Sequence, residues 1–239
     1  MKQERVELLP RKPRIKICGL RDVATIAAME GLPIQEVGLV FAPSKRQVTA
    51  IEAEELVDAI HQLNDETARA VGVFVNHPLE DMTLLLQHVP LDVVQLHGNE
   101  DIQYYAQLHD VFPNVALWKV ISIEREREYN HQEDQQINEE QRIIEELTPY
   151  VPYIEAILID APGGGTGKPF NWGAIATYRV VADHFELPLY VAGGLHAGNV
   201  AELMTSYHCN GIDVSSGVES DGKKDLNKIN EFVRKVIEA

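Results

Sequence analysis

Short runs of aliphatic and β-branched residues alternate along the chain with longer stretches in which apolar side chains recur at helical spacing. This alternation is typical of βα units, in which a parallel sheet is built from strands that are each followed by a helix. Eight runs have the length and composition of strands, namely residues 14–18, 36–41, 69–75, 91–96, 115–121, 155–160, 187–192 and 211–216. Eight repeats predict an α/β fold of the closed (β/α)8 type, a single-domain TIM barrel, rather than an open doubly wound sheet.

The alternation within each run predicts which side chains face the barrel interior, because successive side chains of a strand point to opposite faces. In the first run Ile15 and Ile17 are expected to face the helices, so that Lys16 and Cys18 point inward. Active sites of such barrels lie at the C-terminal ends of the strands. The same parity brings further polar residues to that end, namely Gln95, His97, Asp160, Asp213 and Ser215.

Length and composition agree with one globular domain. The chain has 239 residues, of which 45% are hydrophobic and 24% are charged, and it is close to the roughly 250 residues typical of such a barrel. This composition excludes disordered, collagen-like and disulfide-rich chains. A formal net charge of −16 disfavours nucleic acid and anionic membranes as partners, so an anionic substrate needs a local binding site.

The cysteines and the start of the chain bear on location. Cys18 and Cys209 form neither a CxxC motif nor a Cys/His metal spacing, which predicts free thiols in a reducing compartment and no metal site. The first residues lack the apolar core of a signal peptide, and no run reaches the roughly 18 apolar residues of a membrane span. We therefore expect a cytoplasmic protein in which residues 1–13 form an N-terminal extension to a barrel of residues 14–239.

One segment between the fifth and sixth runs is strongly acidic. Residues 124–146 contain nine Asp or Glu and three Arg, and we expect an acidic insertion on the barrel rim at about residues 122–147. An apolar helix face is predicted from the spacing of Ile137, Ile143, Ile144 and Leu147. A solvated surface is the simpler interpretation of the charge, and docking of a partner is the alternative.

Glycine-rich segments follow the sixth, seventh and eighth runs. In GGGTGKPF (163–170), Pro162 and Pro169 occupy positions where a nucleotide-binding P-loop needs Gly and Ser or Thr, so a loop that closes over substrate is the better interpretation. The segments 192–195 and 215–217 stand where such barrels bind phosphate through backbone amides, although simple tight turns are the alternative. The candidate residues there are Gly193, Gly194, Ser215, Ser216 and Gly217.

Seven segments together point to one family. In chain order they are KICGLRD, VGLVFAPSKRQV, VGVFVN, DVVQLHGNE, LIDAPGGGTGKPFNW, VAGGLHAGNV and GIDVSSGVE. This set resembles the phosphoribosylanthranilate isomerases of tryptophan biosynthesis from about residue 14 to the C-terminus, apart from the acidic segment. The resemblance implies an Amadori rearrangement of N-(5-phosphoribosyl)anthranilate to 1-(2-carboxyphenylamino)-1-deoxy-D-ribulose 5-phosphate, without a metal or an organic cofactor.

The resemblance also implies roles for individual residues. Asp160 corresponds to the general acid that protonates the ribose ring oxygen as the ring opens to a Schiff base. Cys18 corresponds to the general base that removes the C2′ proton, and Arg46 to the bidentate ligand of the anthranilate carboxylate. The remaining residues would bind a phosphorylated small molecule, with the protein a monomer or a homodimer; they are Gln95, His97, Gly193, Gly194, Asp213, Ser215, Ser216 and Gly217.

These roles make demands on the two reacting groups. The acid has to keep its proton near neutral pH and the base has to be partly ionised, whereas Asp normally titrates at about 3.9 and Cys at about 8.5. We therefore expect burial to raise the pKa of Asp160 and a nearby cation, with Lys16 as the candidate, to favour the Cys18 thiolate. Without the resemblance, a buried apolar Cys, a turn-capping Asp, a surface Arg and a core His would be the simpler interpretations.

Two other functions stay open at this point. A related barrel of tryptophan or histidine biosynthesis would keep the phosphate loops but use a Lys/Glu or Asp/Asp pair at the strand ends, and the pairing of Cys18 with Asp160 argues against it. A binding or scaffold protein would have an inactive barrel and an acidic segment that docks a partner. The presence of Cys18, Arg46 and Asp160 argues against such a loss of activity.

Overall fold

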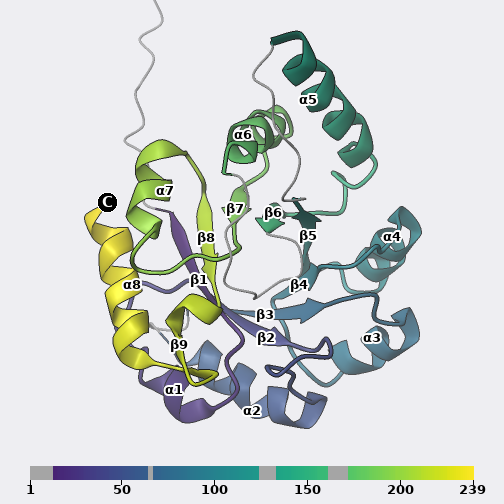
Figure 1. Ribbon diagram of the computed structural model, residues 1–239. Helices are drawn as coiled ribbons and strands as arrows, with labels where there is room; N and C mark the ends of the chain where they lie inside the picture. The colour runs from purple at the N-terminus through teal and green to yellow at the C-terminus, as the bar shows by residue number, and fades with distance from the viewer. Residues whose placement is uncertain (1–12, 64–66, 124–132, 161–171) are drawn as a thin grey trace, which may run out of the picture.

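The computed structural model describes residues 13–63, 67–123, 133–160 and 172–239. Eight parallel strands close into a barrel in sequence order, and helices surround it (Figure 1). The strands are β1 (Arg14–Cys18), β2 (Glu36–Val40), β3 (Arg69–Phe74), β4 (Val93–Leu96), β5 (Ala116–Ser122), β6 (Ala156–Asp160), β7 (Leu189–Val191) and β8 (Gly211–Val214). The predicted (β/α)8 barrel is confirmed.

A helix follows each strand of the barrel. The helices are α1 (Val23–Ala27), α2 (Ala50–His61), α3 (Leu79–Leu86), α4 (Ile102–Val111), α5 (Glu133–Leu147), α6 (Ala174–His184), α7 (Val200–Ser206) and α8 (Leu226–Glu238). Between β8 and α8 lie the 3₁₀ turn η1 (Ser216–Val218) and a hairpin of β9 (Glu219–Ser220) with β10 (Lys223–Lys224). Among the described helices, none combines the length and the apolar character that crossing a membrane requires.

Local sequence determines where several helices begin. At the start of α2, the Thr49 hydroxyl accepts a hydrogen bond from the Glu52 amide while the Glu52 carboxylate accepts one from the Thr49 amide. This reciprocal capping box satisfies two amides that have no partner within the helix. Asp22, Asp101 and Asp225 cap α1, α4 and α8 in a similar way through their carboxylates.

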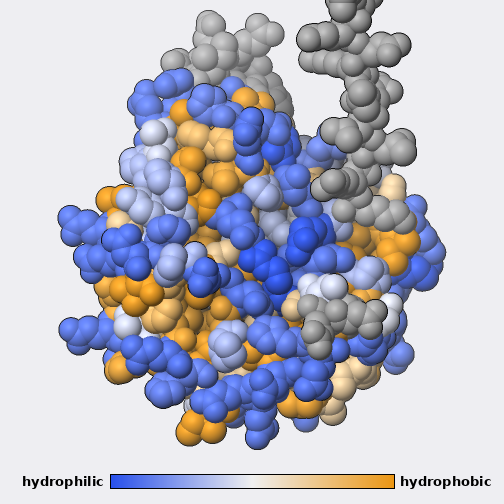
Figure 2. Space-filling view, turned by 180° about the vertical axis from the view of Figure 1, so that it is seen from behind, coloured by the Kyte–Doolittle hydropathy of each residue, from blue (hydrophilic) through white to orange (hydrophobic). Residues whose placement is uncertain are grey.

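The apolar residues form two separate clusters, as strand parity predicts. The larger cluster lies between the strands and the helices and includes Ile15, Ile17, Val94, Leu96, Ile157, Ile159, Ile212 and Val214. The smaller cluster fills the barrel interior with Val71, Val93, Trp118, Val120, Ala156, Leu158, Tyr190 and Ala192. Seen from behind, the outer surface of the molecule is mostly hydrophilic, with apolar residues interspersed (Figure 2).

Large side chains close the N-terminal end of the barrel. The rings of Trp118 and Tyr190 lie 4.3 Å apart between centroids, and the Tyr190 hydroxyl donates to the buried Glu36 at 3.1 Å. Arg14 Nε donates to the same Glu36 oxygen at 2.6 Å. Gly211 pairs with Tyr190 across β7 and β8, and a Cβ at this position would collide with the tyrosine ring. A small-molecule site is therefore left to the opposite, C-terminal end.

The acidic segment contains the helix of the fifth βα unit. In α5, Ile143 and Leu147 are buried and Ile144 packs against the same cluster, while Arg142 and Glu146 form an exposed ion pair with 2.7 Å between Nη1 and Oε1. The side chain of Ile137 and residues 124–132 lie outside the described part of the chain.

Candidate active site

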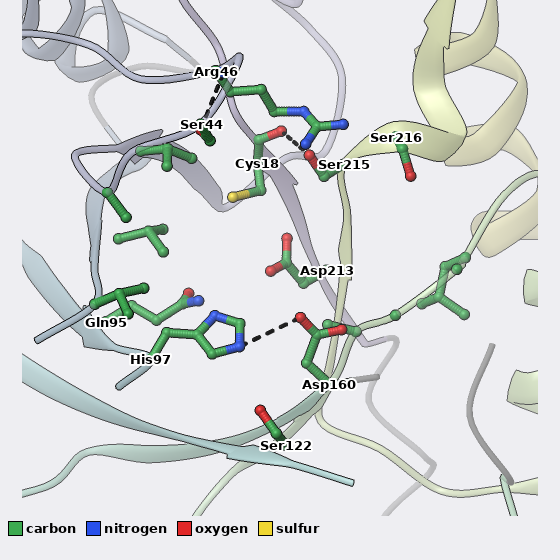
Figure 3. A pocket seen from close by; sticks show the side chains of 18 of the residues that line it. Cys18, Ser44, Arg46, Gln95, His97, Ser122, Asp160, Asp213, Ser215 and Ser216 are labelled. Carbon is green, nitrogen blue, oxygen red and sulfur yellow. Dashed lines mark hydrogen bonds and ion pairs between the residues drawn. The ribbon is translucent and has the colours of Figure 1, made fainter. Parts of the chain in front are cut away.

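A cavity of about 390 Å³ opens at the C-terminal ends of the strands. It is lined by ten of the residues that the sequence indicates, namely Cys18, Arg46, Gln95, His97, Asp160, Gly193, Gly194, Asp213, Ser215 and Ser216. All of these except Gly193 and Gly194 are labelled in Figure 3. The eleventh, Gly217, does not line the cavity. A Cβ on Gly217 would collide with the Leu195 carbonyl oxygen, so this glycine lets the loops after β7 and β8 pack together.

The pairing of β1 with β8 places an ion pair beneath the cavity. Lys16 and Asp213 are register partners in these strands, and Lys16 Nζ donates to Asp213 Oδ2 at 2.8 Å. Lys16 is fully buried and Asp213 is 8% exposed. Cys18 lies two residues beyond Lys16 on the same face of β1, and its sulfur points into the cavity (Figure 3). The Cys18 carbonyl accepts a hydrogen bond from the Ser215 hydroxyl at 3.0 Å.

Opposing effects act on the thiol. Burial raises the pKa of Cys18, the cations Lys16 and Lys224 lower it, and the Asp213 carboxylate raises it again. The net result lies above the usual thiol pKa, so Cys18 is a neutral thiol near neutral pH in the ligand-free protein. The predicted cation is present, but its effect is smaller than that of burial. Burial lowers the pKa of Lys16, but its interactions with Asp213 and Cys18 raise it by more, so Lys16 remains charged.

Asp160 ends β6 on the other side of Asp213 from Cys18 (Figure 3). It is 6% exposed, and Oδ2 lies 3.6 Å from Nε2 of His97, the residue that follows β4. Burial, together with the charge of Lys16, lowers the pKa of His97. The imidazole is therefore neutral near neutral pH. The loop after β6, residues 161–171, lies outside the described residues.

Two residues that line the cavity each carry a buried oxygen atom without a hydrogen-bond partner in the described part of the chain. Among the described residues, Gln95 Oε1 and Asp213 Oδ1 accept no hydrogen bond. Buried acceptors are nearly always satisfied, so these atoms are suited to hydroxyl groups of a ligand. Within the same described part of the chain, no cluster of three or more His, Cys, Asp or Glu side chains is placed to hold a metal ion.

Arg46 reaches the cavity from the loop after β2. Its aliphatic part crosses Gly19, which has a φ of +84° and where a Cβ would lie 2.5 Å from Arg46 Cδ. The guanidinium pairs with Glu219 of β9, with 2.6 Å from Nε to Oε1 and 3.0 Å from Nη2 to Oε2. Lys224 of β10 donates to Glu219 Oε1 at 2.9 Å.

The loop after β7 is built on glycine. Gly193 and Gly194 have φ values of +89° and +68°, a region that other residues adopt only at a cost. The Asn199 side-chain amide donates to the Gly194 carbonyl at 3.0 Å and stabilises the turn. Together with Ser216, this loop lines one side of the cavity.

Some residues of the site were not indicated by the sequence. Val73 and Val75 line the cavity from β3 and the position just after it, and Ser122 lines it from the end of β5. Their inward parity was a signal that could have identified them. Glu219, which pairs with Arg46, and Lys224, which pairs with Glu219, belong to a hairpin outside the barrel, so strand parity gives no signal for them.

A TIM barrel that brings a carboxyl group, a thiol and two glycine-rich loops to the C-terminal end of its strands has the architecture of the barrel enzymes. The family model described as N-(5'phosphoribosyl)anthranilate (PRA) isomerase matches residues 15–235. The N-(5'-phosphoribosyl)anthranilate isomerase of Brevibacillus brevis is 38% identical over 227 residues, which cover 93% of each chain. That of Thermoanaerobacter sp. is 36% identical over 223 residues, which cover 93% of this chain and 97% of the relative.

Solved structures agree with these sequence matches. Phosphoribosyl anthranilate isomerase from Thermotoga maritima matches with a TM-score of 0.72 and 28% identity, over 95% of this chain and 100% of that one. The Pyrococcus furiosus structure, at 23% identity and over the same shares of the two chains, has a TM-score of 0.75 and supports the fold. The chain therefore belongs to the N-(5'-phosphoribosyl)anthranilate isomerase family.

Proposed function

We propose that this chain converts N-(5-phosphoribosyl)anthranilate into 1-(2-carboxyphenylamino)-1-deoxy-D-ribulose 5-phosphate in tryptophan biosynthesis, with Asp160 as general acid and Cys18 as general base. The observation that carries the proposal is that a buried carboxyl group and a buried thiol, from the ends of β6 and β1, line one cavity. Membership of the isomerase family supports the reaction. A related isomerase, 27% identical, has been solved with reduced 1-(o-carboxyphenylamino)-1-deoxyribulose 5-phosphate.

In the first step Asp160 donates its proton to the ribose ring oxygen. The bond between C1′ and this oxygen breaks, and the nitrogen lone pair forms the C1′=N bond of a Schiff base. The neutral His97 lies 3.6 Å from the Asp160 carboxyl group. Acid assistance of this kind contributes about 10²–10⁴-fold to a rate.

In the second step the Cys18 thiolate removes the proton from C2′. The electron pair of the C–H bond forms the C1′=C2′ bond, and the C=N electrons return to nitrogen, which gives an enolamine. Protonation at C1′ and loss of the hydroxyl proton at C2′ then give the ketone. Only the thiolate is an effective base, so Cys18 has to lose its proton to solvent first, and Lys16 stabilises the resulting anion.

The other polar groups of the cavity have complementary binding roles in this proposal. Arg46 binds the anthranilate carboxylate as a bidentate donor. Gln95 Oε1 and Asp213 Oδ1, the unpaired acceptors, receive hydrogen bonds from the ribose hydroxyls. The loops after β7 and β8 bind the phosphate through backbone amides, with Gly193, Gly194, Ser215, Ser216 and Gly217 as their residues.

The state of the cysteines supports a cytoplasmic location for this activity. Cys18 and Cys209 are both free thiols, and free thiols persist in reducing compartments. Because Cys209 is not part of the cavity, Cys209→Ser serves as a control for effects of thiol removal that are unrelated to catalysis.

The test is the decay of anthranilate-type fluorescence when purified protein meets phosphoribosylanthranilate that is generated in situ. We expect decay faster than spontaneous hydrolysis for the parent and for Cys209→Ser, with the product confirmed by mass, and loss of this activity in Cys18→Ser and Asp160→Asn. Thermal unfolding verifies that each variant is folded. A folded parent that is no faster than buffer would refute the proposed reaction and favour a related barrel activity or a scaffold role.

A further inference from the structure

The strongest feature of the site that the two catalytic steps do not use is the ion pair between Arg46 and Glu219. It joins two loops 173 residues apart in the sequence. Both oxygens of the Glu219 carboxylate are engaged, one by Arg46 Nε at 2.6 Å and the other by Nη2 at 3.0 Å. The side chains are only 10% and 5% exposed, so solvent screens this pair much less than a surface ion pair.

Glu219 is itself held from a second side. Lys224 Nζ donates to Glu219 Oε1 at 2.9 Å and to the Ser215 carbonyl at 2.9 Å, and its side chain is 3% exposed. Glu219 opens β9 and Lys224 closes β10, so the hairpin fixes their separation. Burial raises the pKa of Glu219, but the hydrogen bonds and charges of Arg46 and Lys224 outweigh it and lower this pKa to about 2. The glutamate is therefore an anion at every pH at which the enzyme would work.

The way in which Glu219 contacts Arg46 determines which donors remain. A guanidinium has five N–H donors in a planar fork. Glu219 occupies the side-on edge, formed by Nε and one hydrogen of Nη2. Among the described residues, no contact uses the end-on edge, formed by Nη1 and the second hydrogen of Nη2. That edge matches the two oxygens of a carboxylate, and Arg46 lines the cavity.

We propose that Glu219 is a positioning residue that fixes Arg46 with its end-on edge toward the cavity, and so makes the site selective for substrates with a carboxylate on the aromatic ring. This inference rests on the proposed function. Lys45, Arg46 and Lys224 all pair with Glu219, with 3.5 Å from Lys45 Nζ to Glu219 Oε2, so this cluster carries two net positive charges and suits an anionic ligand. Gly19 assists because the absence of a Cβ lets the arginine side chain lie against the backbone just after β1.

The experiment compares two ligands that differ only in the carboxylate. One is reduced 1-(o-carboxyphenylamino)-1-deoxyribulose 5-phosphate and the other is the phenylamino analogue that lacks the carboxyl group. Titration calorimetry gives the ratio of their Kd values for the parent, Glu219→Gln, Glu219→Asp and Arg46→Met. Glu155→Gln is the control, because Glu155 also forms a bidentate pair with an arginine, accepting from Nη1 and Nη2 of Arg69 at 2.6 and 3.2 Å, at the opposite end of the barrel.

We expect the parent and Glu155→Gln to prefer the carboxylate ligand to the same extent. Loss of the hydrogen bonds between a well-placed arginine and a carboxylate raises Kd by about tenfold or more. Glu219→Gln and Glu219→Asp should therefore reduce the preference by about tenfold, while binding of the analogue without the carboxylate stays at the parental level. In the turnover assay, both Glu219 variants should have a higher KM for phosphoribosylanthranilate and the parental kcat.

The variants also separate the possible failures. If the Glu219 variants bound both ligands more weakly by the same factor, Glu219 would have a purely structural role. If the preference for the carboxylate ligand stayed the same or increased, Glu219 would not position Arg46. Either result would overturn this inference without affecting the proposed function. A parent without preference, unaffected by Arg46→Met, would overturn both the inference and the proposed role of Arg46. Glu219→Asp keeps the charge but is too short to reach both nitrogens, so the test still applies if Glu219→Gln does not fold.

Discussion

Replacing Gly38 with alanine tests whether the position of the Cys18 thiol controls catalysis. Gly38 pairs with Cys18 in the register of β1 and β2. A Cβ at Gly38 would lie 2.7 Å from Cys18 Sγ and 3.0 Å from Cys18 Cα, whereas non-bonded carbon atoms are normally about 3.5–4.0 Å apart. The two strands cannot separate easily, because the amide groups of Gly19 and Leu20 both donate to the Gly38 carbonyl at 2.7 and 3.2 Å.

The expected magnitude follows from this overlap. Overpacking a core position by one methyl group costs about 1–3 kcal/mol, which corresponds to a Tm lower by about 2–12 °C for a domain of this size. The sulfur is the only atom in the contact that can rotate away. Displacement of a reacting group by about 1 Å can reduce a rate by about 100-fold, so we expect kcat/KM to fall by about that factor in addition to the loss of stability.

The assay combines kcat/KM from the fluorescence decay with thermal unfolding, and Gly211→Ala is the matched control. A Cβ at Gly211 would collide with the Tyr190 ring at the N-terminal end of the barrel, so this variant should lose similar stability. It should keep the parental kcat/KM at temperatures well below its Tm, because it does not touch the cavity. Parental kcat/KM in Gly38→Ala, or an equal loss in both variants, would refute the reasoning.

Three further predictions concern the ion pairs and loops around the cavity. Lys16→Met removes a cation that lowers the pKa of Cys18, so the rise of kcat/KM with pH should move to higher pH; a rise at the parental pH would contradict this. Because the variant leaves the buried Asp213 without its partner, the free energy of unfolding in urea should fall by about 3–5 kcal/mol. Gly217→Ala places a Cβ against the Leu195 carbonyl oxygen and should weaken competitive inhibition by inorganic phosphate, without changing alkylation of Cys18 by iodoacetamide. The pKa of Glu219 is lowered to about 2, below the about 4.3 of an unfolded Glu, so its contribution to stability is present above about pH 4.3 and is lost as the pH falls toward 2. The free energy of unfolding, measured in urea, should therefore fall less between pH 5 and pH 3 for Glu219→Gln than for the parent. An equal fall in both proteins would contradict the role of the ion pair.

Much of the barrel and of its mouth follows from one simple regularity of the sequence. Side chains of a strand alternate with period two, and the aliphatic residues mark the face that packs against helices. This is enough to place Lys16, Cys18 and Asp213 in the interior, and the structure confirms all three positions. Predicted and observed strand boundaries differ by two residues or fewer, because the turns that end the strands carry glycine or polar residues.

Other features depend on three-dimensional packing that no local pattern encodes. The contact of Glu219 with Arg46 spans 173 residues, and the hairpin that carries Glu219 has strands of two residues, too short for a periodic signal. The protonation state of Cys18 results from burial acting against Lys16 and Lys224. Whether the pKa of Cys18 is raised or lowered depends on how deeply the thiol is buried and how far it lies from these lysines, and the order of residues alone does not determine either.

The most direct test of the central claim, that Asp160 opens the ring and Cys18 removes the C2′ proton, is the kinetic isotope effect with substrate deuterated at C2′. Cys18→Ser weakens the proton-transfer step, so the isotope effect on its residual kcat should be larger than in the parent. Asp160→Asn slows ring opening, which involves no C2′–H bond, so its isotope effect should disappear. The opposite pattern, or equal effects in both variants, would contradict this division of roles.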